Sequence, residues 1–462
     1  MIHRRMFLLQ TLGTLSAMAV APGTWAATVA KGGRPPNFLF IMADDLGFAD
    51  LGAYGAVSWT TPHLDALAGQ GMRFTQAYAN SCLCSPTRVA LITGRYQYRL
   101  PVGLEEPLHY KQAVADLPGL SPETPTLPAL LKGQGYRTAL IGKWHLGYAP
   151  DYGPLKSGYD YFYGFYSGGV NYFTYKDAFG GHDVFDMDDP VEGGVYLTDA
   201  LTDKAVSTLE AYAKTPDRPF LLSLHHAAPH WPWQGPDDRD AVMSNLMHVD
   251  GGGLGTYASM VQSLDQSVGK VMAALDRLGL ADNTVVIFTS DNGGERFSQT
   301  WPLSGEKGSL LEGGIRVPLV VRWPGLTKPG STSDQVTITM DWTRTMLAAA
   351  NVDLSGLGLD GMDMRPSLAG GAAVSRTLYW RLHGNDQAAV RQGDWKYLKI
   401  GNHEYLFNLA ADPRERGNLA QRQAATFASL KAAYAEWNAT MLPIPEGHKG
   451  YALPAGIFAN VP

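Results

Sequence analysis

The segment Phe38-Leu39-Phe40-Ile41-Met42 is a short run of large apolar residues, and Asp44 and Asp45 follow it almost at once. An unbroken apolar run of this length is typical of a strand that is buried on both faces of a sheet. The two acids then mark the point at which the strand ends. The segment therefore predicts a parallel sheet covered by helices, with carboxylates at the carboxyl end of one strand.

Four further apolar runs predict strands of the same kind, and helical patterns lie between them. Apolar residues three or four positions apart predict a long helix from about Tyr257 to Gly279. Thr61 as N-cap and Pro62 in the first turn predict another helix. The alternation predicts an α/β fold, a large mostly parallel sheet flanked by helices. The further runs are Thr138–Ile141, Phe220–Leu224, Val285–Thr289 and Val317–Val321.

Acids, bases and amides follow four of these strands. In open α/β sheets a ligand lies beyond the carboxyl ends of the strands. One such residue alone is more typical of a turn or a helix cap, but four strand ends together predict a functional site at one edge of the sheet. The residues are Asp44 and Asp45; Lys143 and His145; His225, His226 and His230; and Asp291 and Asn292.

The pattern changes after about Gly370. Short runs separated by turn residues, followed by a helix over Ala424–Trp437, predict a small antiparallel sheet with one helix. We therefore divide the chain into a targeting segment (1–26), a large α/β domain (27–370) and a C-terminal α+β subdomain (371–462). The short runs that predict the strands of this subdomain are Thr377–Arg381, Ala388–Arg391, Lys396–Ile400 and Tyr405–Leu409.

The N-terminus has the features of an export signal. Arg4 and Arg5 precede a modestly apolar stretch that runs to Ala21, and Thr24-Trp25-Ala26 offers a cleavage site. The arginine pair favours the twin-arginine type, with an ordinary secretory signal or an anchor as the alternative. Removing residues 1–26 removes two arginines and no acids, so the formal charge of −6 becomes −8. We expect an exported protein, in the bacterial periplasm or secreted.

The composition excludes several classes of protein. Of the 462 residues 45% are hydrophobic, which is typical of a globular chain and not of a disordered one. No run of Lys or Arg provides a basic face for nucleic acid. No apolar stretch after the signal approaches the roughly 18 residues that span a bilayer, so we expect no membrane span in the mature chain. The sequence leaves the oligomeric state open.

The only two cysteines, Cys82 and Cys84, are one residue apart and cannot join distant loops. In an exported protein this spacing favours a chemical role. Pro86 suits the first turn of a helix, so Cys84 lies at a helix amino end, where free N–H groups favour an anion. Arg88 can reach back to the same anion. A buried structural thiol is the alternative.

The segment Cys84-Ser85-Pro86-Thr87-Arg88, continued as VALITGR, resembles the signature of the type I sulfatases of the alkaline phosphatase superfamily. Thr87 stands where serine is commoner, but the Cys-x-Pro-x-Arg core is intact. The resemblance covers nearly everything after the signal. It implies an alkaline phosphatase-like fold and a Cα-formylglycine made from Cys84 by a formylglycine-generating or maturase enzyme. Six further stretches match in order: Ile41–Gly47, Gly142–Gly147, Ala228–Pro232, Ser290–Gly294, Gly305–Lys307 with Glu312–Pro318, and Leu406–Leu409 with Asp412-Pro413 and Asn418-Leu419.

The strand-end acids form a candidate metal site. Three carboxylates and one amide carbonyl make an all-oxygen set that suits Ca²⁺ better than zinc, with Mg²⁺ as the alternative. The resemblance makes these residues the metal ligands, together with an oxygen of the modified Cys84 and a sulfate oxygen. They are Asp44, Asp45, Asp291 and Asn292.

The resemblance also assigns catalytic roles. The hydrated aldehyde at Cys84 carries two hydroxyls: one attacks sulfur, and the other allows sulfate to leave by elimination. His145 takes the proton for that release, while His230 with Lys307 contacts sulfate and protonates the departing alcohol. The metal and three cations neutralise the sulfate charge, and two of these cations also hold the hydrate. The cations are Arg88 and Lys143, which hold the hydrate, and Lys307.

These observations predict a sulfuric ester hydrolase that acts on a sulfated small molecule or carbohydrate. The alternatives are a phosphonate monoester or phosphodiester hydrolase of the same superfamily, and a non-catalytic binder of sulfated glycans in which Cys84 is unmodified. A mature charge of −8 disfavours a densely sulfated polymer as substrate. Trp231, Trp233 and Trp301 follow site motifs and are candidates for stacking on sugar rings, with local packing as the alternative.

Overall fold

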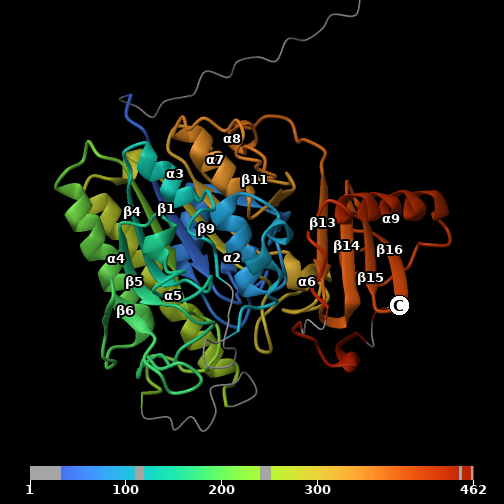
Figure 1. Cartoon of the computed structure of the whole chain (residues 1–462), viewed down its shortest axis with the longest axis horizontal. Helices are drawn as coiled ribbons and strands as arrows, with labels where there is room; N and C mark the ends of the chain where they lie inside the picture. Colours follow the sequence, from blue (N-terminus) through green and yellow to red (C-terminus); the bar gives the residue numbers. More distant parts are fainter. Residues whose placement is uncertain (1–32, 110–118, 240–250, 447–449, 459–460, 462) are drawn as a thin grey trace, which may run out of the picture.

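The computed structural model describes residues 33–109, 119–239, 251–446, 450–458 and 461. The predicted export signal, residues 1–26, lies outside them. The described strands form a ten-stranded sheet with helices on both faces, a separate four-stranded sheet near the C-terminus and one small two-stranded sheet (Figure 1). The predicted α/β class with a C-terminal antiparallel subdomain is therefore confirmed.

The centre of the large sheet is parallel. Its strand order is β11-β2-β10-β9-β1-β8-β4-β5-β6-β7, and β9, β1, β8, β4 and β5 all run in the same direction. The four strands predicted to carry polar residues at their ends are therefore neighbours. They are β1 (Asn37–Ala43), β4 (Arg137–Lys143), β8 (Phe220–His225) and β9 (Thr284–Ser290), and β5 covers Tyr161–Phe165.

The edges of the large sheet are mixed. The predicted run Val317–Val321 forms strand β10, which covers Leu319–Arg322 and pairs antiparallel with β9. Its apolar pattern could not reveal this direction, because an antiparallel strand buried on both faces has the same composition. The other outer strands are β2 (Met72–Phe74), β6 (Val184–Asp186), β7 (Asp189–Pro190) and β11 (Ser331–Ser333), and the two-stranded sheet joins β3 (Ala77–Tyr78) to β12 (Thr337–Ile338).

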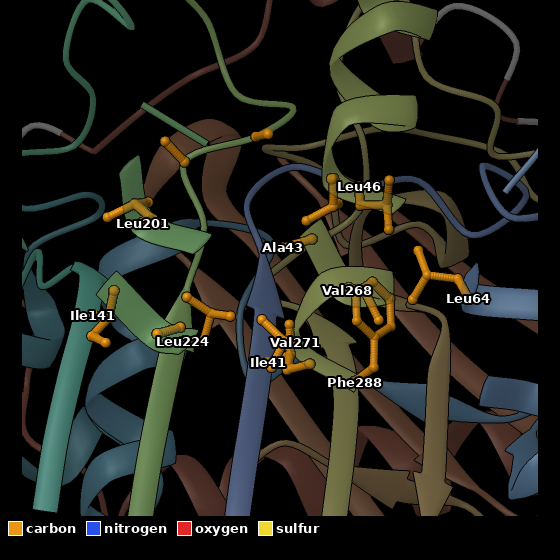
Figure 2. Close-up of a cluster of buried hydrophobic side chains, with 14 of the residues drawn as sticks. Ile41, Ala43, Leu46, Leu64, Ile141, Leu201, Leu224, Val268, Val271 and Phe288 are labelled. Carbon is orange, nitrogen blue, oxygen red and sulfur yellow. The ribbon is translucent and has the colours of Figure 1, made fainter. Parts of the chain in front are cut away.

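Alternate side chains of the central strands enter two different cores. On one face Ile41, Leu224 and Phe288 pack against α1, α4 and α5, as Figure 2 shows. On the other face Phe40 and Leu140 pack against α2, α3 and α7. Burial on both faces explains why these strands are unbroken apolar runs. The helices are α1 (Pro62–Gln70), α2 (Cys84–Thr93), α3 (Leu127–Gly133), α4 (Leu197–Ala213), α5 (Leu254–Arg277) and α7 (Asp341–Ala349).

Helix α1 begins at Pro62 as predicted, but the side chain of Thr61 does not cap it. The Thr61 hydroxyl instead accepts a hydrogen bond from the backbone N–H of Gly52 and donates one to Asp65. No helix among the described residues is long and apolar enough to cross a membrane.

The C-terminal sheet is an antiparallel meander in the order β13-β14-β15-β16, with α9 packed on it (Figure 1). Its inner face is not exposed, because Trp380 and Phe407 join a buried cluster with Tyr78 and Leu310 of the large domain. The sheet therefore packs directly on the domain that carries the strand ends. The elements are β13 (Thr377–Leu382), β14 (Gln387–Gln392), β15 (Trp395–Ile400), β16 (His403–Asn408) and α9 (Ala424–Asn438), and two short helices, α6 (Glu312–Ile315) and α8 (Arg365–Leu368), precede them.

Candidate active site

The carboxyl ends of three central strands place their charged side chains in one buried region. Asp44 and Asp45 follow β1, Lys143 is the last residue of β4, and Asp291 and Asn292 follow β9. None of the five is more than 1% exposed. The predicted convergence of the strand ends is therefore present in the structure.

Cys84 lies in the same region, as the first residue of α2. Its Sγ atom is 3.4 Å from Oδ1 of Asp44 and 3.9 Å from Oδ1 of Asp45. Burial raises the pKa of the Cys84 thiol well above its usual value, although Lys143 and Lys307 lower it in part. The thiol is therefore protonated at neutral pH, although it lies at a helix amino end.

Three buried cations pair with the three carboxylates, so the formal charges of the cluster cancel. Pairing of this kind offsets much of the cost of burying each charge. The guanidinium of Arg88 binds Asp291 through two nitrogens, and it also interacts electrostatically with Cys84. The pairs, with their N–O distances, are Arg88–Asp291 at 2.8 Å, Lys143–Asp44 at 2.5 Å and Lys307–Asp45 at 2.6 Å.

The donor set fits a hard divalent cation. Oδ1 of Asn292 is buried and has no hydrogen-bond partner in the described part of the chain. Burial and the nearby Asp291 carboxylate raise the pKa of Asp44 to about 8, although Lys143 and Arg88 lower it in part. Ligand atoms of Asp44, Asp45, Cys84 and His230 lie within 4.8 Å of one another. Carboxylate and amide oxygens are the ligands that Ca²⁺ and Mg²⁺ prefer.

His145 and His230 lie close enough to this cluster for its lysines to act electrostatically on their rings. Nε2 of His145 is 3.0 Å from the carbonyl oxygen of Leu108, so this nitrogen carries the hydrogen and Nδ1 carries the lone pair. Nδ1 of His230 lies 2.5 Å from the carbonyl oxygen of Trp231, so Nε2, 3.6 Å from Asp45, is the free position. Burial lowers the pKa of both imidazoles well below the usual value. Each can therefore accept a proton at neutral pH.

The other two histidines of the predicted group, His225 and His226, contact the backbone and a side chain of neighbouring elements. Nδ1 of His225 is 3.3 Å from the carbonyl oxygen of Lys143, and Nε2 of His226 is 3.1 Å from the Ser267 hydroxyl. Of the three, only His230 has a ring nitrogen within 4 Å of the carboxylate of a predicted metal ligand in the described structure, at 3.6 Å from Asp45.

The three tryptophans differ in exposure. The Trp233 ring packs against Tyr257 and Phe297, which confirms local packing for that residue. Trp231 lies 4.5 Å from the His230 ring, measured between centroids. Trp301 is 71% exposed on the loop between Asn292 and Lys307 and stays a candidate for stacking on a sugar.

Two features were not predicted from the sequence. Glu295 is buried with Oε2 3.5 Å from Nζ of Lys307, and burial raises its pKa to about 7. It directly follows the matched stretch Ser290–Gly294, which was the available signal in the sequence.

The backbone at Gly168 and Gly169 lies against the rings of His145 and His230. The signal there was a pair of glycines in an otherwise aromatic stretch.

The fold and the site together define a protein of the alkaline phosphatase-like α/β class, with a buried cluster of charged side chains at the strand ends and a cysteine at a helix amino end. The profile of the Sulfatase family matches residues 36–352, and that of the N-sulphoglucosamine sulphohydrolase C-terminal region matches residues 306–436. The chain belongs to the sulfatase family and is a sulfatase.

Named relatives agree with this assignment. The chain is 30% identical over 474 residues to arylsulfatase J of Mus musculus, covering 89% of this chain and 77% of that protein. It is 34% identical over 434 residues to arylsulfatase A of Homo sapiens, covering 85% and 81%. Among solved structures, Ps i-CgsB in complex with k-i-k-neocarrahexaose superposes with a TM-score of 0.81 at 30% identity, covering 89% of this chain and 94% of that one.

Proposed function

We propose that this sulfatase removes sulfate from a carbohydrate ester, with a formylglycine formed from Cys84 and one Ca²⁺ ion as its cofactors. The observation that carries the proposal is the position of Cys84, at the amino end of α2 and within 4 Å of two buried carboxylates. Burial raises the pKa of the unmodified thiol well above its usual value, which disfavours the thiolate and supports a modified residue as the nucleophile. A similar protein, Ps i-CgsB, whose structure holds k-i-k-neocarrahexaose, supports a carbohydrate substrate.

The oxygens of Asp44, Asp45, Asp291 and Asn292 would hold the cation, with Mg²⁺ as the alternative. A divalent cation bound to these carboxylates competes with the lysines for the same oxygens. The ammonium groups of Lys143 and Lys307, now 2.5 and 2.6 Å from Asp44 and Asp45, would then be available to the sulfate oxygens. The two lysines would thus pair with Asp44 and Asp45 before the cation binds, and with the sulfate afterwards.

Formylglycine, as its hydrate, supplies one hydroxyl that attacks the sulfur and a second through which sulfate is later released. The chain's own residues move the protons. Nδ1 of His145 carries a lone pair and has no partner in the described structure, so it can take the proton that sulfate release requires. The Lys307 ammonium is the proton source for the departing alcohol as its bond to sulfur breaks, and Nε2 of His230, which carries a lone pair, can take up that proton and pass it on.

The test is a set of initial rates on sulfate, phosphate and phosphonate esters of one alcohol. We expect the sulfate ester to be cleaved at least about 100-fold faster than the others, because the site cations match one monoanionic group. A faster phosphonate or phosphodiester reaction would favour the other hydrolase of the superfamily. Binding of sulfated sugars without turnover, by protein whose Cys84 remains a thiol, would favour the non-catalytic alternative.

A second comparison addresses the substrate, at fixed ionic strength, across aryl sulfates, short sulfated sugars and intact polymers. We expect kcat/KM to be highest on a short sulfated sugar, since contacts to the sugar ring made in the transition state add to those made to sulfate. The fastest turnover on a dense polymer, slowed by added salt, would instead require a long basic groove.

The proposal includes export to the periplasm or beyond, with Cys84 modified by a formylglycine-generating or maturase enzyme. The support is the arginine pair Arg4-Arg5 before an apolar stretch. Replacing both arginines by lysine in the full-length chain should keep the protein in the cytoplasm in a fractionation experiment. Unchanged export would favour an ordinary secretory signal.

A further inference from the structure

The segment Ser167–Gly169, the glycine spacer, runs between the two site histidines. A Cβ atom added to Gly168 would lie 3.0 Å from Cε1 and 3.2 Å from Nε2 of His145. A Cβ atom added to Gly169 would lie 3.1 Å from both Cε1 and Nδ1 of His230. Neither glycine has the positive φ that a side chain disfavours. Glycine is therefore needed at both positions for close approach to the rings, not for an unusual backbone.

The spacer is held by a buried carboxylate. Oδ2 of Asp183 accepts a hydrogen bond from the backbone N–H of Ser167 at 2.9 Å, and Oδ1 accepts one from Tyr166 at 3.2 Å. The Ser167 hydroxyl donates to the carbonyl oxygen of Gly169 at 3.0 Å. Asp183 is only 4% exposed, so water does not compete strongly for these bonds.

Tyr166 and Tyr172, which lie on either side of the spacer in the sequence, form hydrogen bonds with the backbones of the two histidines. The N–H of His145 donates to the carbonyl oxygen of Tyr166 at 3.1 Å, and the Tyr172 hydroxyl donates to the carbonyl oxygen of His230 at 2.8 Å. One short segment thus contacts both the ring and the backbone of each histidine, although the two follow different strands of the sheet.

We propose that the glycine spacer sets the separation and orientation of the His145 and His230 rings, and that Asp183 is the positioning residue that holds the spacer in place. The inference rests on the proposed function, which gives the two histidines separate roles. His230 acts up to departure of the alcohol, and His145 acts after it. A Cβ atom at either glycine must push one ring by a few tenths of an ångström and so slow one half of the reaction.

The experiment compares Gly169→Ala and Gly168→Ala on aryl sulfates of graded leaving-group pKa and on a sulfated sugar. Gly169→Ala should lower kcat/KM about tenfold on poor leaving groups and less on good ones, because those alcohols depend most on a well-placed acid. Gly168→Ala should lower kcat on good leaving groups and leave kcat/KM within about twofold, because kcat/KM reports only the steps through the first irreversible one.

Gly153→Ala is the matched control. Gly153 has φ −74°, and a Cβ atom there would meet Tyr166 at an ordinary 3.4 Å, so both constants should stay at the wild-type level. If both spacer variants change the same constant to the same extent, or neither changes, the inference is wrong while sulfate turnover by the wild type still supports the proposed function. A modified, cation-loaded wild type that hydrolyses no sulfate ester overturns both.

Asp183→Asn tests the anchor. An amide offers one acceptor oxygen where the carboxylate offers two, so one of the N–H groups loses its partner. We expect kcat and kcat/KM to fall together by about five- to tenfold per folded molecule. Asp177→Asn is the control, because Asp177 is also buried and holds a neighbouring turn through Phe179 and Gly181. An activity loss that only follows the loss of folded protein, equal in both variants, would make Asp183 a structural residue and overturn its positioning role.

Discussion

The active site and the contact between the large domain and the C-terminal sheet each contain a cluster of buried charged side chains. One is the active-site cluster of paired acids and cations at the strand ends. The other, the junction cluster, consists of Glu312, Lys396 and Glu415 and joins the large domain to the C-terminal sheet. Nζ of Lys396 lies 2.9 Å from Glu312 and 2.8 Å from Glu415, and all three residues are at most 1% exposed. Both clusters are buried, but the active-site cluster pairs three cations with three acids, whereas the junction cluster has one lysine for two acids.

The two clusters also differ in whether their remaining polar atoms have hydrogen-bond partners. In the junction cluster the remaining oxygens have partners within the chain, since Tyr78 donates to Oε2 of Glu312 and the N–H of Glu312 donates to Oε2 of Glu415. In the active-site cluster, Oδ1 of Asn292 and Nδ1 of His145 have no hydrogen-bond partner in the described structure. Buried polar atoms without a partner that lie beside paired acids therefore support a ligand site at the strand ends.

The largest expected effect is at Cys84. Cys84→Ala should lower kcat by about 10⁴-fold or more, because it removes the precursor of the nucleophile, and should leave the melting temperature nearly unchanged. Cys82→Ala is the control and should retain most activity, since Cys82 is also fully buried and its carbonyl oxygen still accepts from Gly308. Peptide mass analysis of active wild type should show an aldehyde at Cys84 and a thiol at Cys82. Full activity with Cys84 wholly a thiol would disprove the assignment.

The next effect is loss of the cation. Asp291→Asn should reduce bound metal and lower turnover by at least about 100-fold, because one of three carboxylate ligands is removed while the site keeps its shape. Chelation of the wild type should give the same loss, restored by Ca²⁺ and less well by Mg²⁺. Elemental analysis of the purified proteins measures the metal. Unchanged metal content and rate in the variant would remove Asp291 from the ligand set.

The junction cluster should respond in the opposite way. Lys396→Met should lower the free energy of unfolding by about 3–5 kcal/mol, because two buried carboxylates lose their shared cation. The kcat of the folded fraction should change by less than about threefold. Lys399→Met, on the same strand, is the control: its ion pair with Asp386 is partly exposed and should contribute less than about 1 kcal/mol. A large loss of kcat at Lys396 with stability intact would contradict the comparison.

The sequence predicted those parts of this molecule that depend on local pattern. Phe38–Met42 could be recognised as a strand because burial on both faces leaves no polar position, and the runs after Gly370 because turn residues separate them. Pairings between distant segments could not be predicted. Nothing near Lys396 indicates that its partner is Glu312, and Arg88 lies close to Cys84 in sequence yet binds Asp291.

The smallest expected effect is a pH dependence of stability that comes from the junction cluster. Burial raises the pKa of Glu415 from the usual 4.5 to about 7, despite the nearby Lys396. Burial would also raise the pKa of Glu312, but Lys396 and Arg316 hold it near 2. Between about pH 4.5 and 7 the folded chain therefore keeps a proton on Glu415 that the unfolded chain has lost, so this residue makes stability fall as pH rises. Glu312 acts in the opposite direction, but only as pH falls from about 4.5 toward 2.

Glu415→Gln, which is neutral at every pH, should reduce the loss of stability between pH 5 and 7 by about 1–3 kcal/mol, measured by denaturant unfolding. Other buried acids with raised pKa values, such as Asp50 and Glu106, remain in the variant, so only the difference between the two proteins is informative. Equal slopes in wild type and variant would mean that Glu415 is ionised in the folded protein and that Lys396 neutralises both carboxylates at once.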